Sequence, residues 1–198
     1  MPRPARLVVR DQPHHVTQRG NRRQRTFFRE EDYALYLSLL RHACAKTGTD
    51  VWAWCLMPNH VHLILVPARE DALAAALGPL HRRYSIEVNH REGWSGHLWQ
   101  SRFASFPLDE AHLYACLRYV ELNPVRAGLV ERPEDWPWSS ARGHLGLGPD
   151  RLTDPAAARA RVEDWRAFLD AGLDPSTHAD LRLAERRGRL QPPGPRTD

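Results

Sequence analysis

Two histidines separated by one residue, His60 and His62, stand at the start of a strongly apolar run that continues to Val66. Side chains alternate across a β-strand, so both imidazoles would project from the same face. Neutral imidazoles held on one rigid strand can bind a divalent metal ion, because the strand fixes their separation. The spacing therefore indicates a metal site, although a pair of packing or surface histidines would give the same pattern.

A phenol and an amide lie downstream, in a segment with the marks of a helix that Asp109 caps and Pro124 stops. Apolar residues recur there with the period of a buried helix face, at Leu113, Cys116, Leu117 and Val120. Tyr119 and Asn123 lie one turn apart along the edge of that face. They could act as a nucleophile beside a metal ligand. The alternative is a half-buried tyrosine with a packing role only.

Positive charge gathers at the N-terminus. The net charge is +4, yet residues 1–29 hold eight arginines against one acid, which makes +7 for this part. Four of these arginines fall in a short segment that predicts a phosphate-binding loop after the first strand: Arg19, Arg22, Arg23 and Arg25. A solvated basic loop without a ligand would have the same composition.

Aromatic residues add a weaker indication of a nucleic-acid partner. Unpaired bases stack on aromatic side chains, and Trp99 lies among polar and basic neighbours close to Arg102. Both residues are candidates for DNA contact. Four other tryptophans are expected to pack in the core: Trp52, Trp54, Trp136 and Trp138.

The elements that must position these groups follow from periodicity. We predict strands near 13–19, 50–56, 60–66 and 97–107, and helices over 30–46 and 70–90, the second kinked or split at Gly78-Pro79. The link Met57-Pro58-Asn59 favours a hairpin, and the basic turn His81-Arg82-Arg83 is expected to face outward. The order β-α-β-β-α-β predicts an α+β, ferredoxin-like antiparallel sheet with helices on one face, plus an extra helix that carries Tyr119.

Residues 1–149 are expected to form the main domain and residues 150–198 a helical C-terminal extension. In the extension we predict helices over 156–169 and 175–187, without groups for chemistry, and a disordered tail over 190–198. The three cysteines predict buried free thiols in a reducing compartment. No segment has the length of a membrane span or the pattern of a signal sequence, so we expect a soluble, cytoplasmic protein without membrane contact.

Four separated blocks of this sequence resemble the single-tyrosine HUH endonucleases, and most closely the REP-associated tyrosine transposases, which are related to IS200-like transposases. The blocks are residues 14–23, 58–64, 118–130 and 136–140. The resemblance implies the HUH single-strand transposase fold. It also implies that Tyr119 attacks a phosphorus of single-stranded DNA and forms a 5′-phosphotyrosine, and that His60, His62 and Asn123 hold Mg²⁺ or Mn²⁺.

The implied partner is single-stranded DNA with a palindromic, REP-like hairpin. The implied assembly is a monomer or a homodimer, with Tyr119 acting in cis or in trans. Two other classes of protein fit the same residues: a noncatalytic regulator that binds single-stranded or hairpin DNA, and a metal-dependent phosphoesterase without a covalent intermediate. A trapped protein–DNA adduct would separate the first class from these two.

Overall fold

The central sheet has four antiparallel strands in the order β2-β3-β1-β4. They are β1 (His14–Arg19), β2 (Thr49–Met57), β3 (His60–Pro67) and β4 (Ala104–Pro107). The computed structural model describes residues 6–150, 152, 158 and 160–187. This sheet confirms the predicted α+β, ferredoxin-like fold.

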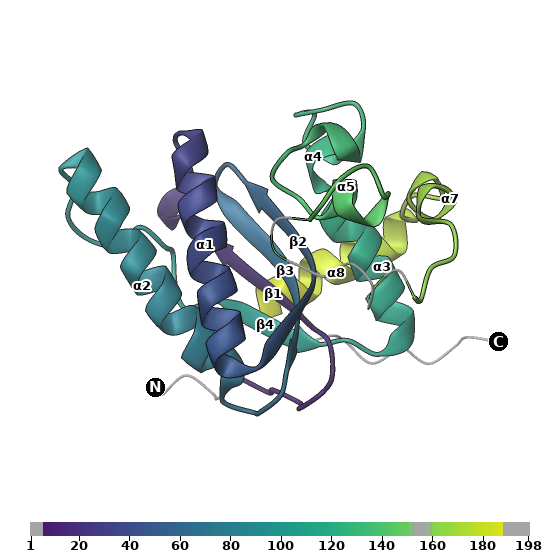
Figure 1. Cartoon of the computed structure of the whole chain (residues 1–198), viewed down its shortest axis with the longest axis horizontal. Helices are drawn as coiled ribbons and strands as arrows, with labels where there is room; N and C mark the ends of the chain where they lie inside the picture. The colour runs from purple at the N-terminus through teal and green to yellow at the C-terminus, as the bar shows by residue number, and fades with distance from the viewer. Residues whose placement is uncertain (1–5, 151, 153–157, 159, 188–198) are drawn as a thin grey trace.

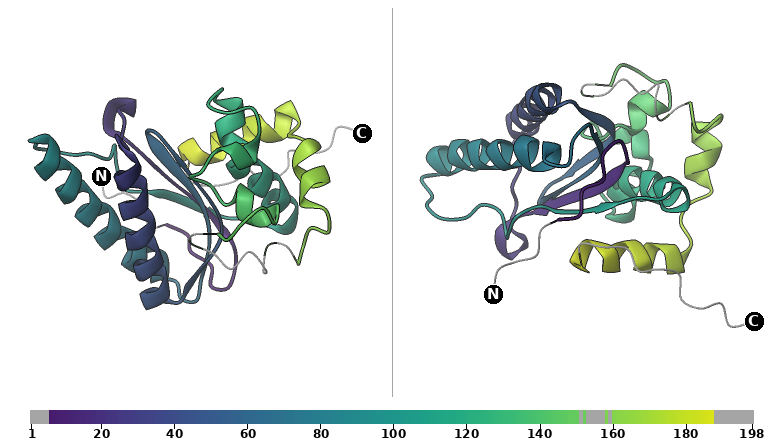
Figure 2. Two further views of the ribbon diagram at one scale, coloured as in Figure 1. Left: turned by 45° about the horizontal axis from the view of Figure 1, so that its top comes forward. Right: turned by 90° about the horizontal axis from the view of Figure 1, so that it is seen from below.

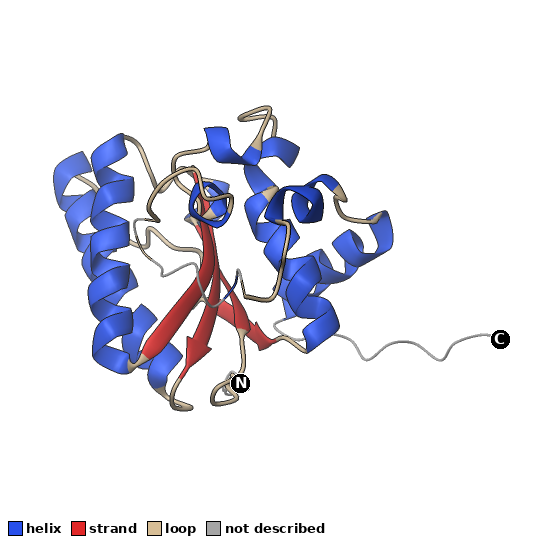
Figure 3. Cartoon of the chain, turned by 45° about the vertical axis from the view of Figure 1, so that its right-hand side comes forward, coloured by secondary structure: helices blue, strands red, loops and turns tan. Residues whose placement is uncertain are grey.

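Helices cover both faces of the sheet (Figure 1, Figure 2). The helices α1 (Glu30–Thr47) and α2 (Ala72–Glu92) lie on one face, and α3 (Glu110–Glu121) and α8 (Pro175–Arg187) lie on the other. Short elements complete the chain: η1 (Asn21–Arg23), α4 (Asn123–Arg126), η2 (Pro133–Asp135), α5 (Ala141–His144) and α7 (Trp165–Asp170). Figure 3 shows α3 and its neighbours grouped across the sheet from the α1–α2 pair.

Strand β3 separates two hydrophobic cores because its side chains alternate. Val61, Leu63 and Leu65 are fully buried in the core under α1 and α2. Ile64 is fully buried in the second core, under α3 and α8. His60 and His62 lie on the same face of the strand as Ile64, because they are separated from it by an even number of residues. The strand therefore presents both imidazoles to the α3 side.

The predicted hairpin between β2 and β3 is confirmed, with Met57 opposite His60 and a two-residue turn at Pro58 and Asn59. The chain after β1 is tied to this turn. The carbonyl of Asn59 accepts from the Gly20 amide at 2.8 Å. A Cβ on Gly20 would approach the carbonyl oxygen of Gln24 to 2.3 Å, so only glycine fits here. The basic segment is thereby held beside His60.

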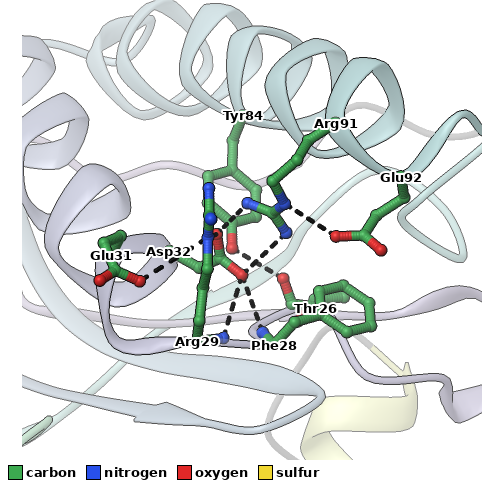
Figure 4. A network of polar contacts seen from close by, with 8 residues as sticks. All are labelled: Thr26, Phe28, Arg29, Glu31, Asp32, Tyr84, Arg91 and Glu92. Carbon is green, nitrogen blue, oxygen red and sulfur yellow. Dashed lines mark hydrogen bonds and ion pairs between the residues drawn. The ribbon is translucent and has the colours of Figure 1, made fainter.

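An ion pair fastens α1 to α2 (Figure 4). The buried carboxylate of Asp32 binds the Arg91 guanidinium, with 3.1 Å between Oδ2 and Nη2, and accepts from the Phe28 amide at 2.8 Å. The Tyr84 hydroxyl donates to the Thr26 carbonyl at 2.7 Å. A buried carboxylate needs such partners to offset its desolvation, and together they fix α2 against the start of α1.

Helix α2 corrects two predictions. It runs without a break through Pro79, because an apolar face that includes Leu77 and Leu80 is buried against the sheet and α1. Proline removes only one backbone donor from a helix held this way. His81 faces inward rather than outward, with its Nε2 accepting from the Tyr36 hydroxyl at 2.9 Å, whereas Arg82 and Arg83 are exposed as expected.

The strand predicted over 97–107 is too long, since β4 covers only Ala104–Pro107. Leu98 and Trp99 are adjacent and both buried in the α1–α2 core. A regular strand would direct them to opposite faces. In this part of the predicted strand, the β-pairing consists of one isolated bridge between Trp99 and Gly20.

The extension also departs from prediction. In the range of the helix expected over 156–169, Ala158 is helical, the described residues 160–164 are not, and α7 begins at Trp165, where the Asp164 carboxylate accepts from the Ala167 amide at 3.0 Å. Residues 153–157 and 159 lie outside the described residues. Helix α8 has the predicted bounds. The tail over 190–198 also lies outside the described residues, and the division of the chain after residue 149 stays a prediction.

Two further expectations concern cysteines and membranes. All three cysteines are free and buried, as predicted: Cys44, Cys55 and Cys116. Among the described helices, none combines the length and apolar character needed to cross a bilayer.

Candidate active site

His60, the first histidine of the predicted pair, lines a cavity of about 800 Å³ bounded by β1, α3, α4 and α8. The His62 side chain is buried and is not part of the cavity wall, and 4.8 Å separate the centroids of the two imidazole rings. Burial, together with the charges of Arg19 and Arg126, lowers the pKa of His60 to about 3. Burial also lowers the pKa of His62 well below its usual value. Both rings are therefore neutral, the form in which imidazole binds a metal.

Each of these imidazoles is oriented through its Nδ1 atom. Nδ1 of His60 lies 2.6 Å from the amide oxygen of Asn59. Nδ1 of His62 lies 3.1 Å from Nε2 of His15 and 3.4 Å from Oε1 of Glu185. These contacts use the Nδ1 atom of each ring, and the Nε2 atom of His62 is buried without a hydrogen-bond partner. An outer-shell oxygen on one nitrogen and an unpaired second nitrogen are typical of metal-binding histidines.

Tyr119 lines the same cavity as His60 and contacts the ring of His62. The Asp109 side chain caps α3 by accepting from the His112 amide at 2.9 Å, as predicted. Tyr119 lies near the C-terminal end of that helix, 4% exposed, and its ring stands edge-on to His62 with 5.4 Å between centroids. Burial, and then the charge of Glu185, raises the pKa of Tyr119, whereas Arg126 opposes this shift. The resting side chain is a neutral phenol.

Asn123 also lines the cavity, although it does not belong to the helix of Tyr119. Helix α3 ends at Glu121, and Asn123 begins the short α4, whose first turn contains Pro124. The side chain of Asn123 is buried, and its amide nitrogen has no hydrogen-bond partner. An unpaired buried amide at a cavity wall fits a ligand position, since either end of the amide can be turned toward the ligand.

A buried carboxylate anchors the end of α3. Glu121 is fully buried and accepts three hydrogen bonds, from the Ser140 hydroxyl at 2.7 Å, Nδ1 of His144 at 2.5 Å and the Trp165 indole at 2.7 Å. These partners come from the start and end of α5 and from α7. The network therefore fixes the backbone that carries Tyr119.

Three of the predicted DNA-binding arginines line the cavity: Arg19, Arg23 and Arg102. Arg22 and Arg25 are exposed beside it and are not part of its wall. Two arginines that the sequence did not single out, Arg126 and Arg182, also line it. Five guanidinium groups around one cavity supply the positive charge and the hydrogen-bond donors that phosphate groups require.

Trp99 is a core residue rather than an accessible stacking platform. It is 7% exposed, its indole donates to the His81 carbonyl at 3.3 Å, and its ring packs against Tyr84 with 5.8 Å between centroids. Sequence alone suggested exposure because the neighbouring residues are polar. In the folded structure, packing against the α1–α2 core buries Trp99 instead.

Helix α8 supplies groups that the sequence did not assign to the site. Leu181 and Ala184 anchor it in the second core, and His178, Arg182 and Glu185 line the cavity. The extension therefore contributes polar side chains to the cavity wall, which the sequence did not indicate. The signal was present as an i, i+4, i+7 polar stripe, but such a stripe is ordinarily a solvated helix face.

His15 and Glu185 extend the set of groups suited to a cation. One ligand atom each from His15, His62 and Glu185 lies within 4.8 Å of the others. Burial raises the pKa of Glu185 to about 7, although hydrogen bonding from Tyr119 and the charge of Arg19 act to lower it. These three residues form a separate nitrogen and oxygen donor set, on the Nδ1 side of His62, that fits a divalent metal.

A ferredoxin-like sheet whose central strand presents a His-x-His pair to a helix-borne tyrosine defines the class that the sequence indicated, the HUH-type tyrosine transposases. A family model described as "Transposase IS200 like" matches residues 8–123, more than half of the chain. The chain therefore belongs to the IS200-like transposase family. The match ends at Asn123, so α8 lies beyond it.

Curated relatives share this region. The REP-associated tyrosine transposase of Escherichia coli K12 is 25% identical over 115 residues, which cover 56% of this chain and 67% of that protein. A Haemophilus influenzae Rd protein that bears the same name provisionally is 28% identical over 116 residues, which cover 53% of this chain and 66% of that protein, slightly less than two thirds.

A solved structure supports the fold. The structure of a REP-associated tyrosine transposase bound to a REP hairpin matches with a TM-score of 0.58 at 22% identity, over 75% of this chain and 89% of that one.

Proposed function

We propose that this chain is a REP-associated tyrosine transposase that cleaves and rejoins single-stranded DNA at palindromic hairpins through a 5′-phosphotyrosine. The observation that carries the proposal is the contact between the rings of Tyr119 and His62, at the wall of an arginine-lined cavity that Tyr119 shares with His60. The relatives named for REP sequences support the choice of hairpin DNA as substrate. A reaction on bacterial DNA would take place in the cytoplasm.

The arginines of the cavity would bind the phosphates on either side of the scissile bond, and Arg126 would lie beside the reacting oxygen, since its guanidinium carbon is 4.3 Å from the Tyr119 ring centroid. The Tyr119 oxygen bonds to phosphorus while the bond from phosphorus to the 3′-oxygen of the preceding nucleotide breaks. The products are a 5′-phosphotyrosine and a free 3′-hydroxyl. The new ester keeps the energy of the broken one, so a 3′-hydroxyl can later attack it and rejoin DNA without a nucleotide cofactor.

His60, His62 and Asn123 would hold the metal in this scheme, with Mg²⁺ or Mn²⁺ favoured by a shell that mixes nitrogen, amide oxygen and phosphate oxygen. When bound, the cation polarises the scissile phosphate and offsets charge on its non-bridging oxygens. Asn59 and Glu185 orient the two imidazoles from behind. Because Tyr119 and both histidines meet within one chain, we propose that Tyr119 acts in cis and that a monomer is sufficient.

The test is incubation with labelled single-stranded hairpin DNA from the flanks of the gene, with Mg²⁺, followed by denaturing electrophoresis. We expect a covalent adduct with the wild-type protein. Tyr119→Phe should abolish cleavage and adduct while hairpin binding stays within about threefold, because one hydroxyl adds little affinity. Tyr114→Phe, on the same helix and in contact with Phe168, is the matched control and should react normally.

Each other outcome points to another class of protein. Hairpin binding without cleavage would indicate a noncatalytic regulator. Cleavage without an adduct, undiminished by Tyr119→Phe, would indicate a phosphoesterase without a covalent step.

A further inference from the structure

Three side chains from three different elements bring one possible ligand atom each close together. They are His15 of β1, His62 of β3 and Glu185 of α8. Nε2 of His15 lies 3.1 Å from Nδ1 of His62. Oε1 of Glu185 lies 3.4 Å from that Nδ1 and 3.9 Å from Nε2 of His15, so the three atoms form a compact triangle.

The size of this triangle matches the coordination shell of a zinc ion. A point at equal distance from the three atoms lies about 2.0 Å from each of them, and zinc binds imidazole nitrogen and carboxylate oxygen at about 2.0–2.2 Å. Two imidazoles also favour Zn²⁺ over Mg²⁺ and Mn²⁺, which prefer shells richer in oxygen. The donor set therefore points to zinc.

The three groups have little contact with solvent. The side chains of His15 and His62 are 0% and 1% exposed, and that of Glu185 is 14% exposed. The two rings share one hydrogen bond, whereas Oε1 of Glu185 has no hydrogen-bond partner among the described residues. A buried carboxylate oxygen without a donor is costly, and a cation between it and the two nitrogens would offset that cost.

We propose that His15, His62 and Glu185 form a zinc site that fastens α8 to the sheet. The site uses Nδ1 of His62, whereas the metal of the proposed reaction is assigned to Nε2, so zinc binding does not depend on that function. On binding, the proton of the hydrogen bond between the rings moves to the other nitrogen of its own ring, and both imidazoles stay neutral. Leu181 and Ala184 pack α8 in the second core, and zinc adds a link from this helix to β1 and β3.

The site has a consequence for the other metal position. A neutral imidazole has one free lone pair, so His62 bound to zinc through Nδ1 carries its proton on Nε2. In that form it is not available to the metal of the proposed reaction. The two ions therefore exclude each other, although they share no other ligand.

The first measurement is calorimetric titration of the full chain with Zn²⁺ after removal of metal by a chelator, without DNA. The His60→Ala variant isolates the site, because it lacks a ligand of the other position, and we expect it to bind one zinc ion. Adding His15→Gln or Glu185→Gln should weaken binding by about 10²-fold or more, since each removes one of three protein ligands. His178→Gln, also on α8, is the matched control and should stay within about threefold.

Loss of zinc binding in His60→Ala alone, or its retention after Glu185→Gln is added, would overturn the inference. Far-UV circular dichroism shows which variants are folded. His15 and Glu185 belong to separate elements, so one folded variant of the two is sufficient for the test.

A second measurement tests the link to α8. In His60→Ala, zinc should slow hydrogen exchange of the amides of residues 175–187, and it should raise the midpoint of thermal unfolding by about 5–10 °C at about 100 times Kd. Helix α2 supplies no ligand, and its exchange is the internal control. Unchanged exchange in α8 with zinc bound would overturn the inference. In the wild-type protein, zinc should weaken Mn²⁺ binding, and an unchanged Mn²⁺ affinity would exclude His62 as a zinc ligand.

Discussion

The amide oxygen of Asn59 lies 2.6 Å from Nδ1 of His60, one residue further along the same hairpin. This contact uses Nδ1 of His60, a side chain that lines the cavity, and leaves Nε2 as the nitrogen for a ligand. The turn of the β2–β3 hairpin thus sets the direction in which a metal-binding nitrogen points, and the other side of the Asn59 amide donates to the Arg23 carbonyl at 2.9 Å.

Asn59→Ala should weaken Mn²⁺ binding by about 10- to 100-fold, because the imidazole of His60 loses the partner that fixes its tautomer and orientation. Titration calorimetry or electron paramagnetic resonance of Mn²⁺ measures this without DNA. Asn59→Asp keeps the acceptor and should stay near the wild-type affinity, whereas His60→Ala should remove measurable binding. Equal affinity of Asn59→Ala and wild type would show that the contact does not serve a metal.

Arg126→Gln should slow adduct formation by about 10²-fold, because its charge lies over the Tyr119 ring and stabilises negative charge on the reacting oxygen. Single-turnover kinetics at saturating hairpin DNA separate this effect from binding. Arg132→Gln, an exposed substitution outside the cavity wall, is the control. A rate equal to wild type would remove Arg126 from the reaction.

Replacing Arg22, Arg23 and Arg25 together by Ala should weaken hairpin binding and flatten its dependence on salt. Each phosphate contact that is lost lowers the slope of log affinity against log salt by about one. The measurement is fluorescence anisotropy over a range of KCl concentrations. Arg41→Ala, on an exposed position of α1, should leave the slope unchanged. A triple variant with the wild-type slope would leave the basic segment without a role in binding.

Acid should destabilise the fold in part through His81. Burial, and then the charge of Arg6, lowers its pKa to about 3, whereas an unfolded histidine titrates near about 6.5. Between these values the unfolded chain binds a proton that the folded chain excludes. Stability is therefore complete above about pH 6.5 and is lost as the pH falls toward about 3.

His81→Gln retains an acceptor for the Tyr36 hydroxyl but cannot titrate. We expect the loss of stability between about pH 6.5 and 5 to become shallower by up to about 1.4 kcal/mol per pH unit. Urea unfolding at several pH values measures this slope, with His97→Gln at an exposed loop position as the control. Parallel pH dependences for His81→Gln and wild type would contradict a buried neutral His81.

The sequence allowed prediction of features that local rules encode. Alternation along β3 predicts the common face of His60 and His62, and the cap at Asp109 with the apolar stripe of α3 predicts the helix of Tyr119. The element order follows from the same rules, which is why the sheet agrees with expectation.

The rest depends on tertiary contacts that local patterns do not specify. Nothing in the sequence near Trp99 or His81 shows that these side chains pack against each other, with ring centroids 5.2 Å apart. The polar stripe of α8 likewise resembles any solvated surface until Leu181 and Ala184 dock that helix on the sheet. Glu185 therefore enters the site only through the folded structure.

The placement of α8 divides the cavity between two parts of the chain. The histidine strand and the tyrosine helix fall within the segment shared with the IS200-like family, whereas one wall of the cavity comes from a helix encoded downstream of it. A change confined to that single downstream helix would therefore alter the groups that line the cavity while leaving the strand of His60 and His62 and the helix of Tyr119 as they are.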